Sequence, residues 1–192
     1  MTHTFSTYMK SALLIIFVVS SAFMGADRTE PAQALELEEE GVRWYTFEEA
    51  VELSKKEKKK IFIDVYTDWC GWCKKMDKDT FNKDEIAAYL NENYYPVKLN
   101  AEQEEDIVFK GNTFKFVASG RKGYHQLAAA LLQNKLSFPS FVILNEDFEI
   151  INITPGYQQP APFHKIITYY YGDYYASQDK SKQFEEEYKS PF

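Results

Sequence analysis

The chain carries its only two cysteines, Cys70 and Cys73, directly after a nearly continuous apolar run. The run "KIFIDVYT" (60–67) is rich in Ile, Val and aromatic residues, which is typical of a strand buried inside a sheet. The segment that follows, "CKKMDKDTF", has a helical pattern. A buried strand followed by a helix, with both cysteines at the junction, constrains the fold more than any other feature of this sequence.

Strands and helices alternate along the rest of the chain. Thr46 and Glu49 form a T-x-x-E capping box, which predicts a first helix over 47–58. Residues 101–123 fit either a small hairpin around a Gly-Asn turn or a long loop. The remaining elements that we expect are helices at 82–94, at 123–136 and from Pro162, and strands at 94–100, 137–145 and 149–157. This order predicts an α/β fold with a mixed central sheet and helices on both faces.

The N-terminus has the pattern of a targeting segment. Lys10 is followed by the apolar run "SALLIIFVVSSAFMGA", which is short for a membrane span. Cleavage after Ala22 or Ala34 fits the small-x-small rule, so residues 1–34 are interpreted as a signal peptide and linker. The alternative is an uncleaved N-terminal membrane anchor. Both interpretations place the folded part in an exported compartment, such as a periplasm.

Length and charge indicate a single domain and argue against one class of function. The 192 residues suit one domain with appendages, and the net charge of −7 argues against nucleic-acid binding.

The basic run at 55–60 is interpreted as a solvated helix end, with a docking patch as the alternative. The charged segment 177–192 is expected to be a tail that frays. The sequence does not indicate an oligomeric state.

The cysteine and histidine counts limit the kinds of site. A structural disulfide framework would need several separated pairs, and the chain has one adjacent pair. Zinc would need a second pair or two nearby histidines, whereas His3, His125 and His164 are all far from Cys70 in the sequence. We therefore expect no metal and no cofactor besides a redox-active Cys70–Cys73 disulfide. His125 and His164 are expected at the surface or its boundary.

The sequence around and beyond the two cysteines resembles the thioredoxin superfamily. The motif "WCGWC" (69–73) is similar to the W-C-x-x-C of that family, and Asp64 stands where the family carries a buried aspartate. Lys98, in "VKLN", resembles the lysine that pairs with this aspartate. "FPS" (138–140) resembles the family's cis-proline loop, and Gly156 fits its late glycine. These features occur in the right order over residues 44–172.

The resemblance implies a thioredoxin-like domain over residues 35–176. Two departures separate the chain from thioredoxin itself. The middle dipeptide is Gly71-Trp72 where thioredoxin has Gly-Pro, and the stretch between Cys73 and Pro139 is longer, chiefly through residues 101–123. The chain therefore looks more like exported bacterial thioredoxin-like proteins, including the C-terminal domain of transmembrane disulfide reductases.

The motif suits disulfide exchange for a physical reason. The attacking species is a thiolate, and a cysteine at a helix N-terminus is both ionised and exposed. Cys70 is therefore the expected nucleophile, and Cys73, which should be more buried, would release the product. Asp64 would act as the base for Cys73 if burial raises its pKa, and Lys98 would moderate that shift. The alternative for Asp64 is a surface-facing strand residue.

A substrate groove is expected around the cysteines. Trp69 would form an apolar platform, with core packing as its alternative, and Trp72 occupies the position where many isomerases and oxidants carry a histidine. Phe138 and a cis Pro139 would leave backbone free to pair with an extended substrate. The expected substrate-binding set is Trp69, Gly71, Trp72, Phe138 and Pro139.

The leading prediction is an exported thiol-disulfide oxidoreductase that reduces disulfides in other exported proteins, with electrons from a membrane disulfide reductase. An oxidase or isomerase is the first alternative, because a lone CxxC supports either direction. A second is a non-enzymatic binding module that presents residues 101–123 or the tyrosine-rich segment 169–175. A third is a metal-handling protein that uses the CxxC together with His125.

Overall fold

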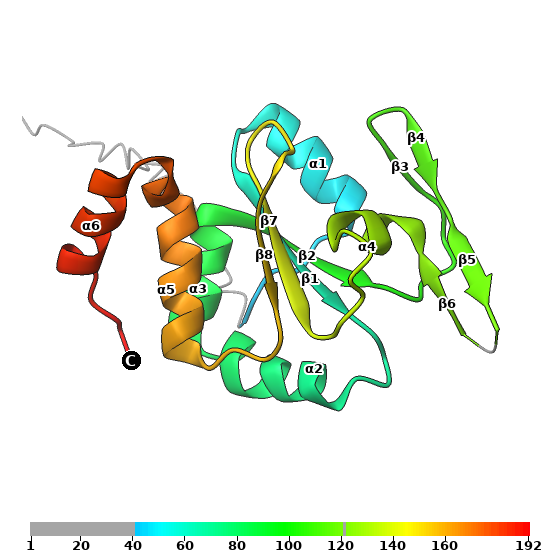
Figure 1. The fold of residues 1–192 in the computed structure, drawn as a ribbon, viewed down its shortest axis with the longest axis horizontal. Helices are drawn as coiled ribbons and strands as arrows, with labels where there is room; N and C mark the ends of the chain where they lie inside the picture. Colours follow the sequence, from blue (N-terminus) through cyan, green and yellow to red (C-terminus); the bar gives the residue numbers. More distant parts are fainter. Residues whose placement is uncertain (1–40, 121) are drawn as a thin grey trace, which may run out of the picture. The chain divides into compact units, whose positions relative to one another are not determined.

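The computed structural model describes residues 41–120 and 122–192 (Figure 1). The predicted signal peptide, its cleavage sites and the alternative membrane anchor lie outside these residues. Within the described ranges, no helix is long and apolar enough to span a membrane.

The central sheet has four strands in the order β2-β1-β7-β8. Its strands are β1 (Lys60–Tyr66), β2 (Tyr94–Asn100), β7 (Ser140–Leu144) and β8 (Ile150–Pro155). β1 pairs with β2 in parallel, whereas β7 runs antiparallel to both β1 and β8. The predicted mixed sheet is confirmed, and β1, which leads to the cysteines, lies in its interior.

Helices cover both faces of the sheet (Figure 1). The helices are α1 (Phe47–Lys56), α2 (Gly71–Met76), the π-helix η1 (Asp77–Phe81), α3 (Asp84–Asn93), α4 (Gln126–Leu131), α5 (Pro160–Tyr171), the 3-10 helix η2 (Tyr174–Ala176) and α6 (Gln178–Glu187). Side chains of β1 alternate between two cores, because successive strand residues point to opposite faces. Ile61 and Ile63 pack in one core with α1 and α4, and Phe62 packs in the other with α3 and α5.

The capping box that predicted α1 is present. Thr46 Oγ1 accepts the Glu49 N–H at 3.2 Å, and the Glu49 carboxylate accepts the Thr46 N–H at 2.9 Å. Thr46→Ala removes one of these bonds, and we expect it to lower the free energy of unfolding by about 1 kcal/mol. Urea denaturation of the two proteins measures this difference. An unchanged midpoint at an unchanged slope would show that the box does not stabilise α1.

Residues 101–123 contain two hairpins. The first pairs β3 (Ile107–Phe109) with β4 (Asn112–Phe114) and confirms the hairpin expected around the Gly-Asn turn. The second pairs β5 (Phe116–Ser119) with β6 (Lys122–His125), and it was not anticipated from the sequence. Both lie beyond the edge of the central sheet, beside α4 (Figure 1).

The structure corrects the prediction for residues 123–136. Their first residues belong to β6, and the helix covers only Gln126–Leu131. The expected surface position of His125 is wrong, because its side chain is fully buried. His125 is the N-cap of α4, where its Nδ1 accepts the Leu127 N–H at 3.2 Å and its Nε2 lies 3.1 Å from the Glu105 carbonyl oxygen. The ring is thus held by the backbone on both sides. His164 is half-buried, as expected.

Two predictions about charged segments are also wrong. Lys60 is not part of a solvated helix end, because it is the buried first residue of β1 and its Nζ lies 3.1 Å from carboxylate oxygens of both Glu146 and Asp173. The predicted fraying after Ser177 is not observed. Residues Gln178–Glu187 form α6, which buries Phe184 against the rings of Tyr169 and Tyr174.

Candidate active site

Cys70 and Cys73 lie at the start of α2 and form a disulfide with a Cα–Cα distance of 5.3 Å. Cys70 is the N-cap, and its Sγ accepts the Cys73 N–H at 3.1 Å. This contact turns the Cys70 sulfur toward the helix, so Cys70 is only 5% exposed and Cys73 is 3% exposed. Cys70 was expected to be exposed, and in the disulfide form that expectation is wrong. The position of Cys70 at the N-terminus of a helix is as predicted.

Asp64 and Lys98 form the predicted pair. They lie directly opposite each other on the parallel strands β1 and β2, and Lys98 Nζ donates to Asp64 Oδ2 at 2.7 Å. The Asp64 residue is only 2% exposed. The alternative of a surface-facing Asp64 is therefore wrong, and the carboxylate lies in the sheet interior with one cationic partner.

A second carboxylate shares this lysine and was missed in the sequence. Asp77, at the start of η1, also accepts a hydrogen bond from Lys98 Nζ. A signal was available, because Asp77 follows Cys73 by four residues and this spacing puts both on one helix face. Rings of three aromatic residues surround the Lys98 ammonium group at centroid distances of 4.8 Å for Trp44 and 5.2 Å for both Tyr66 and Phe81.

Burial has a large effect on the pKa values of Asp64 and Lys98. Loss of hydration raises the pKa of Asp64 to about 6, even though the charge and hydrogen bond of Lys98 act in the opposite direction. Burial also acts to lower the pKa of Lys98, but the carboxylates of Asp64 and Asp77 outweigh it, so this pKa lies above its ordinary value. Near neutral pH the site therefore holds a cationic lysine and a carboxylate with the proton affinity of a useful base.

The two tryptophans beside the cysteines are exposed. Trp69 is 57% exposed and Trp72 is 60% exposed, so core packing is the wrong interpretation of Trp69. The Trp69 ring lies edge-on to Phe138 at 6.1 Å, and the Trp72 ring lies 5.5 Å from Tyr157. Gly71 between them is also exposed, and no atom lies within 4 Å of where its Cβ would be. Together they present an apolar surface next to the disulfide.

The Phe138–Pro139 peptide bond is cis, as predicted. Pro139 is buried at the start of β7, and its carbonyl oxygen accepts the Gly156 N–H at 2.8 Å. Gly156 has a φ of +89°, a conformation that glycine adopts readily and other residues rarely do. The positive φ therefore explains why a glycine suits the position directly after β8.

Thr67 was also missed. Its backbone carbonyl accepts the Cys70 N–H at 3.1 Å. Its hydroxyl is buried and makes no hydrogen bond with any residue in the described part of the chain. The position between a buried strand and the first cysteine was the available signal.

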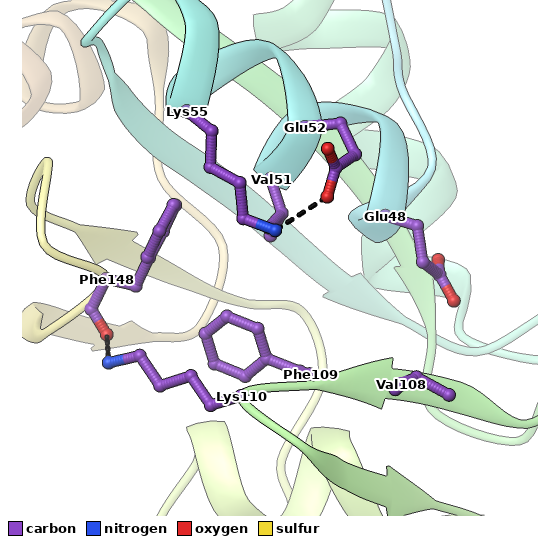
Figure 2. Close-up of a pocket in the computed structure, with 8 residues that line it drawn as sticks. All are labelled: Glu48, Val51, Glu52, Lys55, Val108, Phe109, Lys110 and Phe148. Carbon is purple, nitrogen blue, oxygen red and sulfur yellow. Dashed lines mark hydrogen bonds and ion pairs between the residues drawn. The ribbon is translucent and has the colours of Figure 1, made fainter.

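Figure 2 shows a pocket of about 140 Å³ that is separate from this site. Its lining residues come from α1, the β3–β4 hairpin and the β7–β8 turn: Glu48, Val51, Glu52, Lys55, Val108, Phe109, Lys110 and Phe148. Three of its four charged side chains already have partners, because Lys55 pairs with Glu52 at 2.6 Å and Lys110 donates to the Phe148 carbonyl at 3.2 Å. We do not assign this pocket to the candidate active site.

Metal ligation by the cysteines gains no support from His125, whose two ring nitrogens face backbone groups. Among the residues that the structure describes, no group of three or more His, Cys, Asp or Glu side chains is arranged to hold a metal ion.

Comparison with known proteins matches residues 28–147 to the family model Thioredox_DsbH, described as "Protein of unknown function, DUF255". Spermatogenesis-associated protein 20 of Rattus norvegicus is 36% identical over 84 residues, which are 43% of this chain and 11% of that protein. Thiol:disulfide interchange protein DsbD of Vibrio vulnificus is 34% identical over 68 residues, which are 35% of this chain and 11% of that protein. The chain thus spans about a tenth of the length of these curated relatives.

A similar structure is that of a thioredoxin from Thermus thermophilus. It is 17% identical, with a TM-score of 0.50 over 67% of this chain and 85% of that one. This likeness shows the fold, and the family match covers the strand, the helix and the cysteines that define the site. The chain therefore belongs to the Thioredox_DsbH family and has the thioredoxin-like oxidoreductase fold, with a Cys70–Cys73 disulfide at the start of α2.

Proposed function

We propose that this chain is a thiol-disulfide oxidoreductase that reduces disulfides in exported proteins. The observation that carries the proposal is the Cys70–Cys73 pair at the N-terminus of α2, in a fold that also buries Asp64 against Lys98. The named activity of the Vibrio vulnificus relative, thiol:disulfide interchange, supports it.

Cys70 carries out the first step, the attack on the substrate disulfide. In the reduced protein its sulfur lies at the helix N-terminus, where free N–H groups favour the thiolate. The thiolate attacks one sulfur of a substrate disulfide, a new bond joins Cys70 to that sulfur, and the other substrate sulfur leaves as a thiolate that takes a proton from water.

The second step belongs to Cys73. Its thiol transfers a proton to the Asp64 carboxylate, whose pKa of about 6 suits this exchange near neutral pH. The Cys73 thiolate attacks the Cys70 sulfur, the bond to the substrate breaks, and the second substrate thiolate leaves. The substrate has gained two electrons, and the protein ends as the Cys70–Cys73 disulfide. A dithiol donor must then reduce it again.

The exposed surface beside the cysteines suits a polypeptide substrate. Trp69 and Trp72 offer apolar faces, and the cis bond before Pro139 orients the neighbouring backbone for pairing with an extended chain. Trp72 lacks the imidazole that stabilises the reduced form of strongly oxidising relatives, which supports the reducing direction. The N-terminal apolar run supports export, and a membrane disulfide reductase is the donor that fits an exported reductase.

The proposal is tested by reduction of insulin with dithiothreitol as the electron source. We expect catalytic amounts of the protein to shorten the lag before the insulin B chain precipitates. A parallel assay measures oxidative refolding of a reduced, multi-disulfide protein. Faster refolding without insulin reduction would replace the reductase with an oxidase or isomerase, and no effect in either assay would contradict an enzymatic role.

A further inference from the structure

The β5–β6 hairpin is anchored firmly at its base. The His125 N–H donates to the Ala101 carbonyl at 2.6 Å, and the Gln126 N–H donates to the Lys115 carbonyl at 2.9 Å. The Gln126 side-chain oxygen in turn accepts the Lys115 N–H at 2.8 Å. With His125 itself fully buried, the hairpin is a fixed projection of the domain.

The hairpin is also internally close-packed. Gly123 lies under the ring of Phe116, and a Cβ at Gly123 would come within 2.0 Å of that ring. Only glycine allows this approach, because any side chain here would have to displace the ring. Lys122 directly precedes Gly123, so the packing of Gly123 against Phe116 also fixes the backbone position of Lys122.

Lys122 reaches the candidate active site. Its Nζ lies 4.1 Å from the centre of the Trp69 ring, within the range of a cation–π contact. The Trp69 indole N–H donates to Glu102 at 2.9 Å, and Phe138 meets the same ring edge-on. Groups from three separate segments therefore hold the exposed tryptophan that stands beside Cys70.

The Lys122 ammonium group keeps its charge available. Lys115, at the base of the same hairpin, is paired with Asp106 at 2.5 Å, whereas no carboxylate in the described ranges pairs with Lys122. Neither nearby carboxylate pairs with it: Glu102 accepts the Trp69 indole N–H, and Asp68 accepts the Asn100 amide at 3.1 Å. An exposed cation on the face of Trp69 can thus meet a charge that a substrate brings.

From this geometry we infer that the β5–β6 hairpin is a substrate-recognition arm. Lys122 favours polypeptide disulfides that carry Asp or Glu next to the attacked cysteine. The inference rests on the proposed disulfide exchange and names its substrate class. Complementary charges at the rim of a site act mainly on association and selectivity, so the effect should appear in kcat/KM and weaken with salt.

The test uses two disulfide peptides that differ only in two flanking residues, Asp in one and Lys in the other. Their reduction by the full-length protein is measured at low ionic strength and in about 0.5 M salt. We expect the wild type to prefer the acidic peptide by about 5-fold in kcat/KM at low salt, with the ratio approaching one at high salt. Lys122→Gln should reduce the ratio, and Lys122→Glu should reverse it. Lys182→Glu, which makes the same charge change on α6, should leave the ratio as in the wild type.

The outcomes separate the inference from the proposed function. If the wild type reduces both peptides equally well, or if Lys122→Glu slows both without changing their ratio, the recognition role of Lys122 is overturned while the enzymatic role stands. If neither peptide is reduced, the proposed function fails and the inference fails with it. A preference for the acidic peptide that reverses in Lys122→Glu but not in Lys182→Glu supports the role of the β5–β6 hairpin in substrate recognition.

Discussion

Cys70→Ser should abolish insulin reduction, and Cys73→Ser should leave a protein that reacts once and stays bound to its substrate. Cys70 is the N-cap of α2, so the nucleophilic thiolate is lost when its sulfur is replaced. Cys73 lies one turn further on and supplies the resolving sulfur, so a mixed disulfide at Cys70 persists when that sulfur is missing. Non-reducing gels and mass spectrometry of exported proteins incubated with Cys73→Ser measure the trapped species.

The control for this experiment is the double variant in which both cysteines are serine, which should trap nothing. Thermal unfolding of each variant shows that the fold remains. Residual insulin reduction by Cys70→Ser would remove Cys70 from the nucleophile role. If Cys73→Ser captures no more than the double variant does, the two-step exchange is wrong.

Asp64→Asn should slow the resolving step while it stabilises the fold. The amide has nearly the shape of the carboxylate but cannot accept the Cys73 proton, and loss of a positioned base typically costs about 10²-fold or more. In the wild type, release of a preformed mixed disulfide should quicken as pH rises through about 6, where Asp64 loses its proton. In the variant this rise should disappear. Stopped-flow release of a labelled peptide thiol measures it.

The effect of Asp64 on stability has the opposite sign. Its pKa is raised from 3.8 unfolded to about 6 folded, so the folded state binds the proton more tightly. The contribution is therefore fully present below pH 4 and is lost as pH rises through about 6. At pH 7 the ionised carboxylate costs stability, by about 3 kcal/mol at about 1.4 kcal/mol per pKa unit. Asp64→Asn should raise the free energy of unfolding by up to that amount.

Asp147→Asn is the matched control, since Asp147 is an exposed aspartate in the β7–β8 turn. It should change neither the rate of the resolving step nor the pH dependence of unfolding. A release rate for Asp64→Asn equal to that of the wild type would exclude the base role. A less stable Asp64→Asn protein at pH 7 would show that the Asp64–Lys98 contact outweighs the cost of burying the charge.

The parts of the fold that could be predicted are those that local patterns encode. The capping box of α1 and the apolar strand β1 both follow from short stretches of sequence, and the structure confirms them. The pairing of Asp64 with Lys98 was implied by the resemblance to thioredoxins, and the structure confirms it too. The resemblance to thioredoxins supplied the cis bond at Pro139, which no propensity would have indicated.

The wrong predictions for His125 and Lys60 concern residues whose partners are distant in the sequence. His125 is buried because the Glu105 carbonyl meets its ring, and Lys60 is buried because Glu146 and Asp173 come together around it. Nothing near either residue in the sequence indicates those partners. The contact between Lys122 and Trp69 is of the same kind, since it exists only once the β5–β6 hairpin is folded against the domain.

The reduction potential of the Cys70–Cys73 couple tests the central claim most directly. The protein is equilibrated with mixtures of reduced and oxidised glutathione, and the fraction of dithiol is read by alkylation and mass spectrometry. A reductase predicts a value near or below about −230 mV, on the thioredoxin side of the scale, whereas about −180 mV or above would indicate an isomerase or oxidant. A pair that never exchanges with glutathione, locked as the disulfide or inert as thiols, would contradict the account.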